Sequence, residues 1–153
     1  MIGFWRKAMM VWALSITVFG AVLMAGAFPQ TDAIARALFA LMGGAELTMN
    51  APLRFSIGLM GAVTFGWALM VLAAASVSHL MAPEVCRLLW RRISWAMAAW
   101  FVVDGAISLA TGFGLNVASN LALTAAFLAI VMGAGVFARD TAQGAAPPAA
   151  EPA

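Results

Sequence analysis

Four long apolar runs constrain this chain more than any other feature of its sequence. Each run holds about 20 residues, the length of helix that crosses a hydrocarbon core of about 30 Å. The runs lie near residues 8–28, 54–78, 93–112 and 118–137. Because no strand-like alternation appears, helices are the structure that satisfies every backbone group in lipid. The sequence therefore predicts an all-α, four-transmembrane-helix bundle that forms one domain over residues 1–137.

Composition and charge assign the chain to the membrane rather than to nucleic acid. It is 65% hydrophobic and 9% charged, far outside the range of soluble domains. Of its 8 Lys and Arg residues, all but Arg36 and Arg54 lie next to the ends of the four runs that fall on one side of the membrane, as the positive-inside rule describes. We therefore expect a multi-pass protein of the bacterial inner (cytoplasmic) membrane with both termini cytoplasmic. We expect the lipid bilayer as its partner and no nucleic acid.

The two ends of the chain carry separate predictions. The basic pair Arg6-Lys7 precedes an apolar run that reaches Phe28, longer than the usual apolar core of a signal peptide, which is about 7 to 15 residues. We therefore favour an uncleaved first span, and cleavage of residues 1–27 as a signal peptide is the alternative. Residues 138–153 are rich in Ala and Pro, so we expect a disordered cytoplasmic tail.

The outer loop between the first two spans contains a shorter helical pattern. Pro29 ends the first span, and four apolar residues then recur at helical spacing: Ile34, Leu38, Leu41 and Met42. They predict a short amphipathic helix of about three turns that ends at Gly43-Gly44. We favour a position on the outer interface or over the bundle mouth. A lid on a cavity beside Asp104 is the alternative.

Small residues mark one face of the second span. Gly58, Ala62 and Gly66 recur at spacing four, which lets helix backbones approach closely. Helix packing inside one bundle is the favoured interpretation. Self-association into a homo-oligomer is the alternative.

The chain lacks the residues that common cofactors, metals and catalytic sets require. With one histidine, His79, and one cysteine, Cys86, it can build neither a bis-histidine haem site nor a structural zinc site. Cys86 is expected to be a small apolar filler. No phosphate-binding glycine loop or nucleophile elbow is present. We predict no metal, no cofactor and no catalytic residue set, so membrane catalysis would depend on Asp104 almost alone.

Six tryptophans are distributed between the span ends and the interior. Four lie near the predicted inner ends, where we expect an indole N–H in contact with water: Trp5, Trp12, Trp90 and Trp95. Trp100 lies deeper, one helical turn from Asp104.

Asp104 is the centre of the candidate site. An ionised aspartate near the bilayer centre costs about 2.5 to 3.5 kcal/mol, so its side chain must face protein. Helical spacing places Trp100 and Ser108 on the same stripe as Asp104. These three residues therefore predict one polar face on the third span.

A second polar stripe follows the short link FGLN and consists of Asn116, Asn120 and Thr124. If the third and fourth spans form an antiparallel hairpin, Thr124 lies at the depth of Asp104, and Asn120 at the depth of Ser108. No Lys or Arg lies inside a span to pair with the carboxylate. We therefore expect Asp104 to be a neutral acid that donates to Asn120, Thr124 or a backbone carbonyl.

The motif W-F-x-x-D, which ends at Asp104, and the motif G-x-x-L-N-x-x-x-N, which ends at Asn120, resemble a hairpin of small, uncharacterised four-span bacterial inner-membrane proteins. The resemblance covers about the second to the fourth span, and Gly105 stands where a small polar residue is expected. It implies the four-span fold and the importance of Asp104, Asn116 and Asn120. Those proteins have no assigned activity, so the resemblance implies no function.

Two functional hypotheses from different classes follow. The favoured one is a structural, accessory or partner-binding bundle, in which Asp104 and the asparagines form interhelical contacts worth about 0.6 to 2 kcal/mol each. The alternative is a small transporter or proton-linked protein that uses Asp104 as its intramembrane carboxylate. A cavity that reaches Asp104 favours transport, whereas a dry, fully hydrogen-bonded Asp104 favours the scaffold. A membrane-embedded enzyme comes third.

Overall fold

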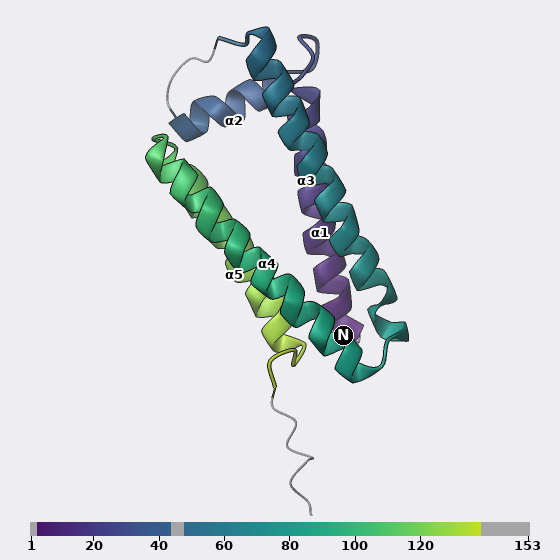
Figure 1. Cartoon of the computed structure of the whole chain (residues 1–153). Helices are drawn as coiled ribbons and strands as arrows, with labels where there is room; N and C mark the ends of the chain where they lie inside the picture. The colour runs from purple at the N-terminus through teal and green to yellow at the C-terminus, as the bar shows by residue number, and fades with distance from the viewer. Residues whose placement is uncertain (1–2, 44–47, 139–153) are drawn as a thin grey trace, which may run out of the picture.

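The computed structural model describes residues 3–43 and 48–138, and every regular element in these ranges is a helix. In chain order these are α1 (Gly3–Ala25), α2 (Ala33–Gly43), α3 (Ala51–Val77), the short 3-10 helix η1 (Ser78–Leu80), α4 (Pro83–Ala110) and α5 (Gly114–Gly133) (Figure 1). All but α2 and η1 are long and apolar enough to cross a membrane. The predicted all-α, four-span fold is confirmed, and the predicted cytoplasmic tail lies outside the described residues from residue 139 onward.

α4 is longer than the predicted third span. It begins at Pro83, well before residue 93, where the third span was predicted to begin. Proline is favoured in the first turn of a helix, because its missing N–H has no partner there in any case. The added turns are also held by packing, since Cys86 and Trp90 are both buried.

The four long helices form two antiparallel pairs. α1 packs along α3, although α2 lies between them in the chain, and α4 packs along α5, which follows it after a short turn. Figure 1 shows the two pairs meeting at the end that holds residue 3, here called the terminus end. They separate toward the other end, here called the α2 end, where α2 crosses from one pair to the other.

The hydrophobic core lies in the terminus half of the bundle. Met9 and Trp12 of α1 meet Trp90 of α4 and Phe127 of α5 there, and all four are buried. The Trp12 indole N–H donates to the Leu123 carbonyl oxygen at 3.0 Å. The Trp90 N–H donates to Ser78 Oγ, also at 3.0 Å. The expectation that these two indoles contact water at the interface was wrong, because each finds its acceptor inside the protein.

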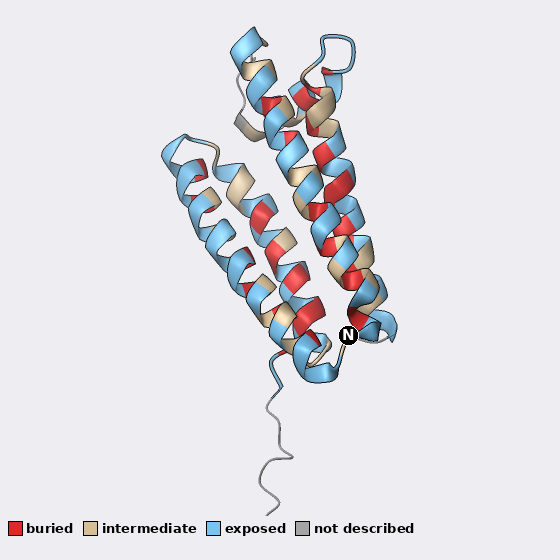
Figure 2. Ribbon diagram, turned by 45° about the vertical axis from the view of Figure 1, so that its right-hand side comes forward, coloured by how far each residue is buried: buried red, intermediate tan, exposed pale blue. Residues whose placement is uncertain are grey.

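The outer faces of the long helices are apolar. Figure 2 shows buried residues on the inward faces and exposed residues around the outside. Large exposed side chains include Val11 on α1, Val63 and Met70 on α3, Val102 on α4 and Leu121 on α5. Such a surface suits contact with lipid tails rather than with water.

The backbones of α1 and α3 approach closely where Gly20 of α1 lies against Gly61 of α3. A Cβ atom added at Gly61 would lie 2.7 Å from the Gly20 carbonyl oxygen, so only glycine fits without moving a helix. The closely packed position is therefore Gly61, which is not part of the predicted stripe of Gly58, Ala62 and Gly66. Gly58 faces Ala27, but Ala62 is exposed and Gly66 has open space where a Cβ would be.

Candidate functional site

A tight turn between α4 and α5 sets the geometry of the site. Gly112 has φ of 83°, a left-handed conformation that glycine adopts without a steric penalty. The Phe113 N–H donates to the Ser108 carbonyl oxygen at 2.8 Å, which closes the last turn of α4 in a Schellman arrangement. α5 then begins at once, at Gly114. The two helices are therefore held as immediate neighbours.

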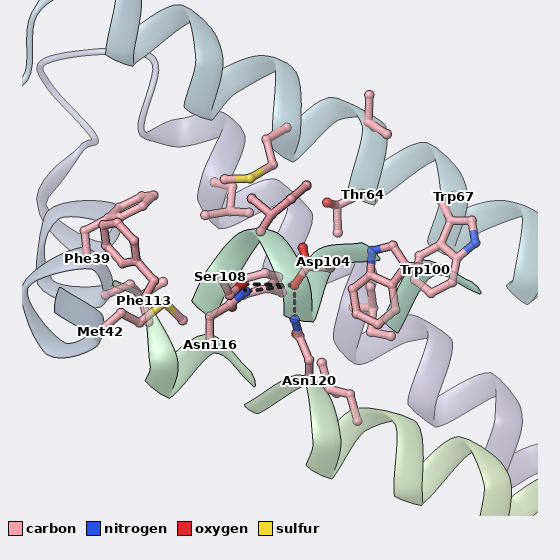
Figure 3. A pocket seen from close by; sticks show the side chains of 18 of the residues that line it. Phe39, Met42, Thr64, Trp67, Trp100, Asp104, Ser108, Phe113, Asn116 and Asn120 are labelled. Atoms are coloured by element: carbon pink, nitrogen blue, oxygen red, sulfur yellow. Dashed lines mark hydrogen bonds between the residues drawn. The ribbon is translucent and has the colours of Figure 1, made fainter. Parts of the chain in front are cut away.

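One oxygen of Asp104 accepts hydrogen bonds from both helices of this hairpin. Asn116 Nδ2 donates to Asp104 Oδ2 at 2.9 Å, and Asn120 Nδ2 donates to the same oxygen. Ser108 Oγ lies 3.4 Å from Oδ2 and accepts from Asn116 Nδ2 at 2.8 Å (Figure 3). Four of the predicted polar residues, Asp104, Ser108, Asn116 and Asn120, thus form one connected group.

The hairpin register differs from the predicted one by a helical turn. Asn120, not Thr124, lies at the depth of Asp104, and Asn116 lies at the depth of Ser108. The tight turn at Gly112 is the reason, because it starts α5 earlier than the expected FGLN link. Thr124 is buried, and its Oγ1 has no hydrogen-bond partner among the described residues. The expected direction of donation was also wrong, since Asn120 donates to the carboxyl group.

A cavity of about 660 Å³ lies between the two helix pairs and reaches Asp104. Its lining comes from all five α-helices and from Thr111 and Phe113 in the turn between α4 and α5. Most of the lining residues on the long helices lie in the half of the bundle nearer α2. Asp104 is six residues before the end of α4 at Ala110, which places it about 9 Å from that end. Toward the terminus end, Trp12 and Met97, which are both core residues, close the cavity.

The cavity opens between α3 and α4. Of its α1 residues, Ile16 and Leu23 are buried and Phe19 is 37% exposed. On the α3 and α4 sides, by contrast, the lining residues Val63 and Ile107 are 65% and 58% exposed. This opening faces sideways from the bundle, where lipid tails surround a membrane protein. A molecule dissolved in the bilayer can therefore enter without crossing the α2 end.

Aromatic rings line the cavity beside Asp104. Trp100 of α4 and Trp67 of α3 stack with ring centroids 6.0 Å apart and an interplanar angle of 26°. Trp67 also meets Trp12 edge to face, and Trp12 contacts Phe127 in the core. The predicted place of Trp100 near Asp104 is thus seen in the structure, where both residues line the same space (Figure 3).

α2 covers the end of the cavity. Leu38, Phe39 and Met42 line it, and Figure 3 shows Phe39 and Met42 beside Phe113. The predicted apolar face is divided, since Ile34 and Leu41 are exposed. α2 therefore lies over the bundle mouth and also over the Asp104 cavity. The two positions that the sequence left as alternatives are the same place in the structure.

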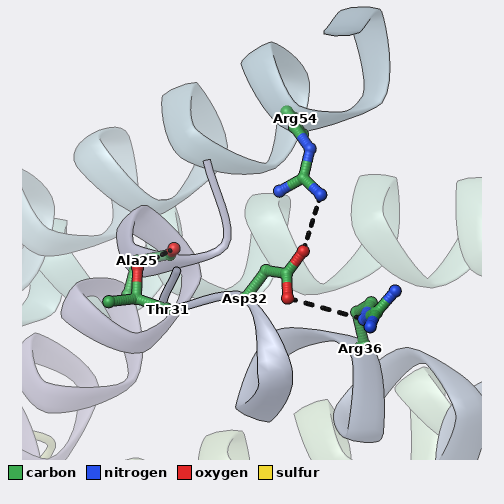
Figure 4. Close-up of polar contacts among 5 residues, drawn as sticks. All are labelled: Ala25, Thr31, Asp32, Arg36 and Arg54. Atoms are coloured by element: carbon green, nitrogen blue, oxygen red, sulfur yellow. Dashed lines mark hydrogen bonds and ion pairs between the residues drawn. The ribbon is translucent and has the colours of Figure 1, made fainter. Parts of the chain in front are cut away.

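An ion pair fixes the start of α2 to the start of α3. The Asp32 side chain is 7% exposed, and its Oδ2 lies 2.7 Å from the Nη2 of Arg54, while Arg36 approaches its Oδ1 at 3.5 Å (Figure 4). Thr31 adds a bond from its hydroxyl to the Ala25 carbonyl oxygen at 2.7 Å. These contacts hold α2 across the mouth of the cavity.

Several residues of the site were not identified from the sequence. Thr64 lines the cavity from α3, one helical turn before Trp67, and Phe39 lines it from α2. The spacing of Thr64 and Trp67 could have indicated a shared face. What the sequence could not show is that this face lies opposite Asp104, because that depends on how α3 packs against α1.

The second oxygen of Asp104 is available to a ligand. No described residue donates to Oδ1, and this atom is not among the buried polar atoms that lack a partner, so it remains accessible. No described Lys, Arg, His or Glu side chain lines the cavity. The described residues also include no group of three or more His, Cys, Asp or Glu able to hold a metal ion.

Comparison of the chain with protein-family models, with curated proteins and with solved structures finds no match. The resemblance of the Asp104 hairpin to small four-span bacterial proteins therefore stays a prediction.

Proposed function

We propose that this chain is a small membrane transporter or proton-linked carrier that binds its solute in the Asp104 cavity. One observation carries the proposal: a cavity of about 660 Å³ reaches a carboxyl oxygen that no described residue engages. This volume lies within the range of about 300 to 1,000 Å³ that small-molecule sites occupy. An ionisable group inside a membrane bundle that faces a cavity is also a common mark of a solute or proton pathway.

In this proposal the two carboxyl oxygens have separate tasks. Oδ2 is held by Asn116 and Asn120, so the carboxyl group keeps its orientation whether or not it is protonated. Oδ1 exchanges a proton with water or binds a donor group of the solute. The closed core at the terminus end means that this conformation gives access to one side of Asp104. By the positive-inside rule, that side is periplasmic in a bacterial inner membrane.

The partner-binding scaffold is the second candidate. It is favoured by the hydrogen bonds to Oδ2, which connect α4 to α5 as expected of structural polar contacts in a bundle. In that case the cavity would hold lipid tails or a helix of a partner, and Asp104 would need no proton exchange.

Chemical labelling distinguishes these two candidates. A lipid-soluble carbodiimide adds to a protonated carboxyl group that it can reach from the bilayer. The intact protein in lipid nanodiscs should be modified at Asp104, as located by peptide mass spectrometry, and an Asp104→Asn variant should lose this modification. The rate should fall as pH rises, because the protonated form is the reactive one. An Asp104 that stays unmodified while the reagent labels an exposed carboxylate such as Glu84 would support the scaffold instead.

A further inference from the structure

The polar groups that face the cavity restrict the kind of solute it can hold. Asp104 Oδ1 is an acceptor when ionised, and no positive side chain of the described residues lines the cavity to neutralise it. Thr64 lines the cavity from α3, across from Asp104 (Figure 3). Hydroxyls of this bundle mostly donate to their own helix, as Thr17, Ser78 and Ser94 do. Thr64 makes no hydrogen bond to any described residue, so its oxygen can accept one.

From this geometry we infer that the solute is an amphipathic protonated amine. Its ammonium group donates to Asp104 Oδ1 and to Thr64 Oγ1, and its apolar body lies along the cavity lining. This inference rests on the proposed function and names its solute class. An anion is disfavoured because it would meet an uncompensated carboxylate. A neutral solute would supply no counter-charge to the carboxylate when it is ionised.

The aromatic residues support the same class of ligand. Trp67 and Trp100 line the cavity on the α3 and α4 sides and stack on each other within it. Aromatic rings attract cations through the negative potential of their faces, most strongly where water is excluded. They also pack well against an apolar or aromatic body. A carboxylate beside tryptophans in an otherwise apolar cavity is therefore suited to a cation that carries hydrophobic groups.

The cavity opening agrees with a solute that partitions into the bilayer. Val63 and Ile107 flank an entrance between α3 and α4, and both are exposed on the lipid-facing surface. An amphipathic amine concentrates at the membrane interface with its head near water. Asp104, about 9 Å from the end of α4, lies within reach of a molecule that enters from that depth.

Asp104 is the charged side chain that the described residues present to the cavity. Its neighbours are the Ser108 hydroxyl on α4, the amides of Asn116 and Asn120 on α5 and, across the cavity, Thr64 on α3. None of these groups is charged in the physiological range. The described lining therefore offers no cation that would compete with the amine for Asp104.

The test compares ligands of one shape and different charge on the intact protein in zwitterionic lipid nanodiscs. Phenylbutylamine, phenylbutanol and phenylbutyrate share an apolar body and differ in the head group. Calorimetric titration against protein-free nanodiscs should show that the amine binds at least about tenfold more tightly than the other two. Asp104→Asn should reduce amine affinity by about the same factor. Thr64→Val should reduce it about threefold to tenfold, because one hydrogen bond is lost.

The results separate failure of this inference from failure of the proposed function. Equal binding of all three compounds would overturn the inference about the amine and leave a solute-binding cavity in place. If none of them binds and Asp104 also resists the carbodiimide, the proposed function fails as well. If trimethylated phenylbutylamine, which has no N–H, binds as tightly as the amine in both wild type and Thr64→Val, the hydrogen bond to Thr64 is wrong. Circular dichroism of each variant checks that it is folded.

Discussion

Asn116 and Asp104 lie on different helices and are joined by a hydrogen bond of 2.9 Å from Nδ2 to Oδ2. The other amide hydrogen of Asn116 goes to Ser108 Oγ, so its amide nitrogen is fully engaged in the hairpin. The Asp104 oxygen that faces α5 thus acts in folding, whereas the oxygen that faces the cavity is free for chemistry. This division allows mutations to separate the structural role of Asp104 from its functional role.

Asp104→Asn should leave thermal stability in detergent nearly unchanged, because an amide oxygen can accept the same bonds from Asn116 and Asn120. Asp104→Leu should lower stability by about 1 to 3 kcal/mol, since two amides lose their acceptor in an apolar environment. The measurement is thermal unfolding of the purified variants. Equal losses in both would show that the negative charge itself holds the hairpin together.

The class of fold could be predicted from the sequence because burial in lipid leaves so few alternatives. Runs of about 20 apolar residues, separated by charged links, specify helices of a defined length. The polar group around Asp104 was also predictable, since a carboxylate and two asparagines inside apolar helices must hydrogen-bond to one another. Spacing alone therefore brought Asp104, Ser108, Asn116 and Asn120 together.

The register of the hairpin, the length of α4 and the cavity could not be derived in the same way. Register depended on the exact residue that turns the chain, and the left-handed φ of Gly112 moved Asn120 into the place expected for Thr124. The start of α4 depended on Pro83, because a proline can either interrupt a helix or stand in its first turn. The cavity depends on how far two helix pairs separate, which is a property of packing between distant segments.

Glycine at position 61 should be essential to the pairing of α1 with α3. Gly61→Ala adds a Cβ that would lie 2.7 Å from the Gly20 carbonyl oxygen, so we expect a loss of about 1 to 3 kcal/mol from overpacking. Gly66→Ala is the matched control on the same helix, because nothing lies within 4 Å of its Cβ position. Thermal unfolding should show the control at or slightly above wild type. Similar losses in both variants would count against the close approach at Gly20.

The orientation in the membrane can be tested with fused reporters. The positive-inside rule predicts that residues following α5 are cytoplasmic. Green fluorescent protein fused after Arg139 should therefore fluoresce, and alkaline phosphatase at the same position should be inactive. The opposite pattern would reverse the orientation and place the α2 end of the bundle, with the cavity, on the cytoplasmic side.

The first span should remain in the mature protein. α1 supplies Trp12 to the core and Ile16 and Leu23 to the cavity, so the described bundle includes it as a packed element. Intact-mass spectrometry of the purified protein should find Met1 or its processed form. A mature N-terminus at Phe28 would support the signal-peptide alternative and remove one side of the site.

The ion pair between Asp32 and Arg54 should determine how firmly α2 covers the cavity. Asp32→Asn leaves Arg54 without its acidic partner, and Arg54 already has one buried nitrogen, Nη1, without a hydrogen-bond acceptor. We expect this variant to lose about 1 to 3 kcal/mol of stability and to loosen α2 from α3. Arg36→Gln is the control, since Arg36 is 57% exposed and its contact with Asp32 is longer, at 3.5 Å. Hydrogen exchange in residues 33–42 should become faster in Asp32→Asn and stay unchanged in Arg36→Gln. Unchanged exchange in both variants would mean that the contacts of Leu38, Phe39 and Met42 alone hold the helix in place.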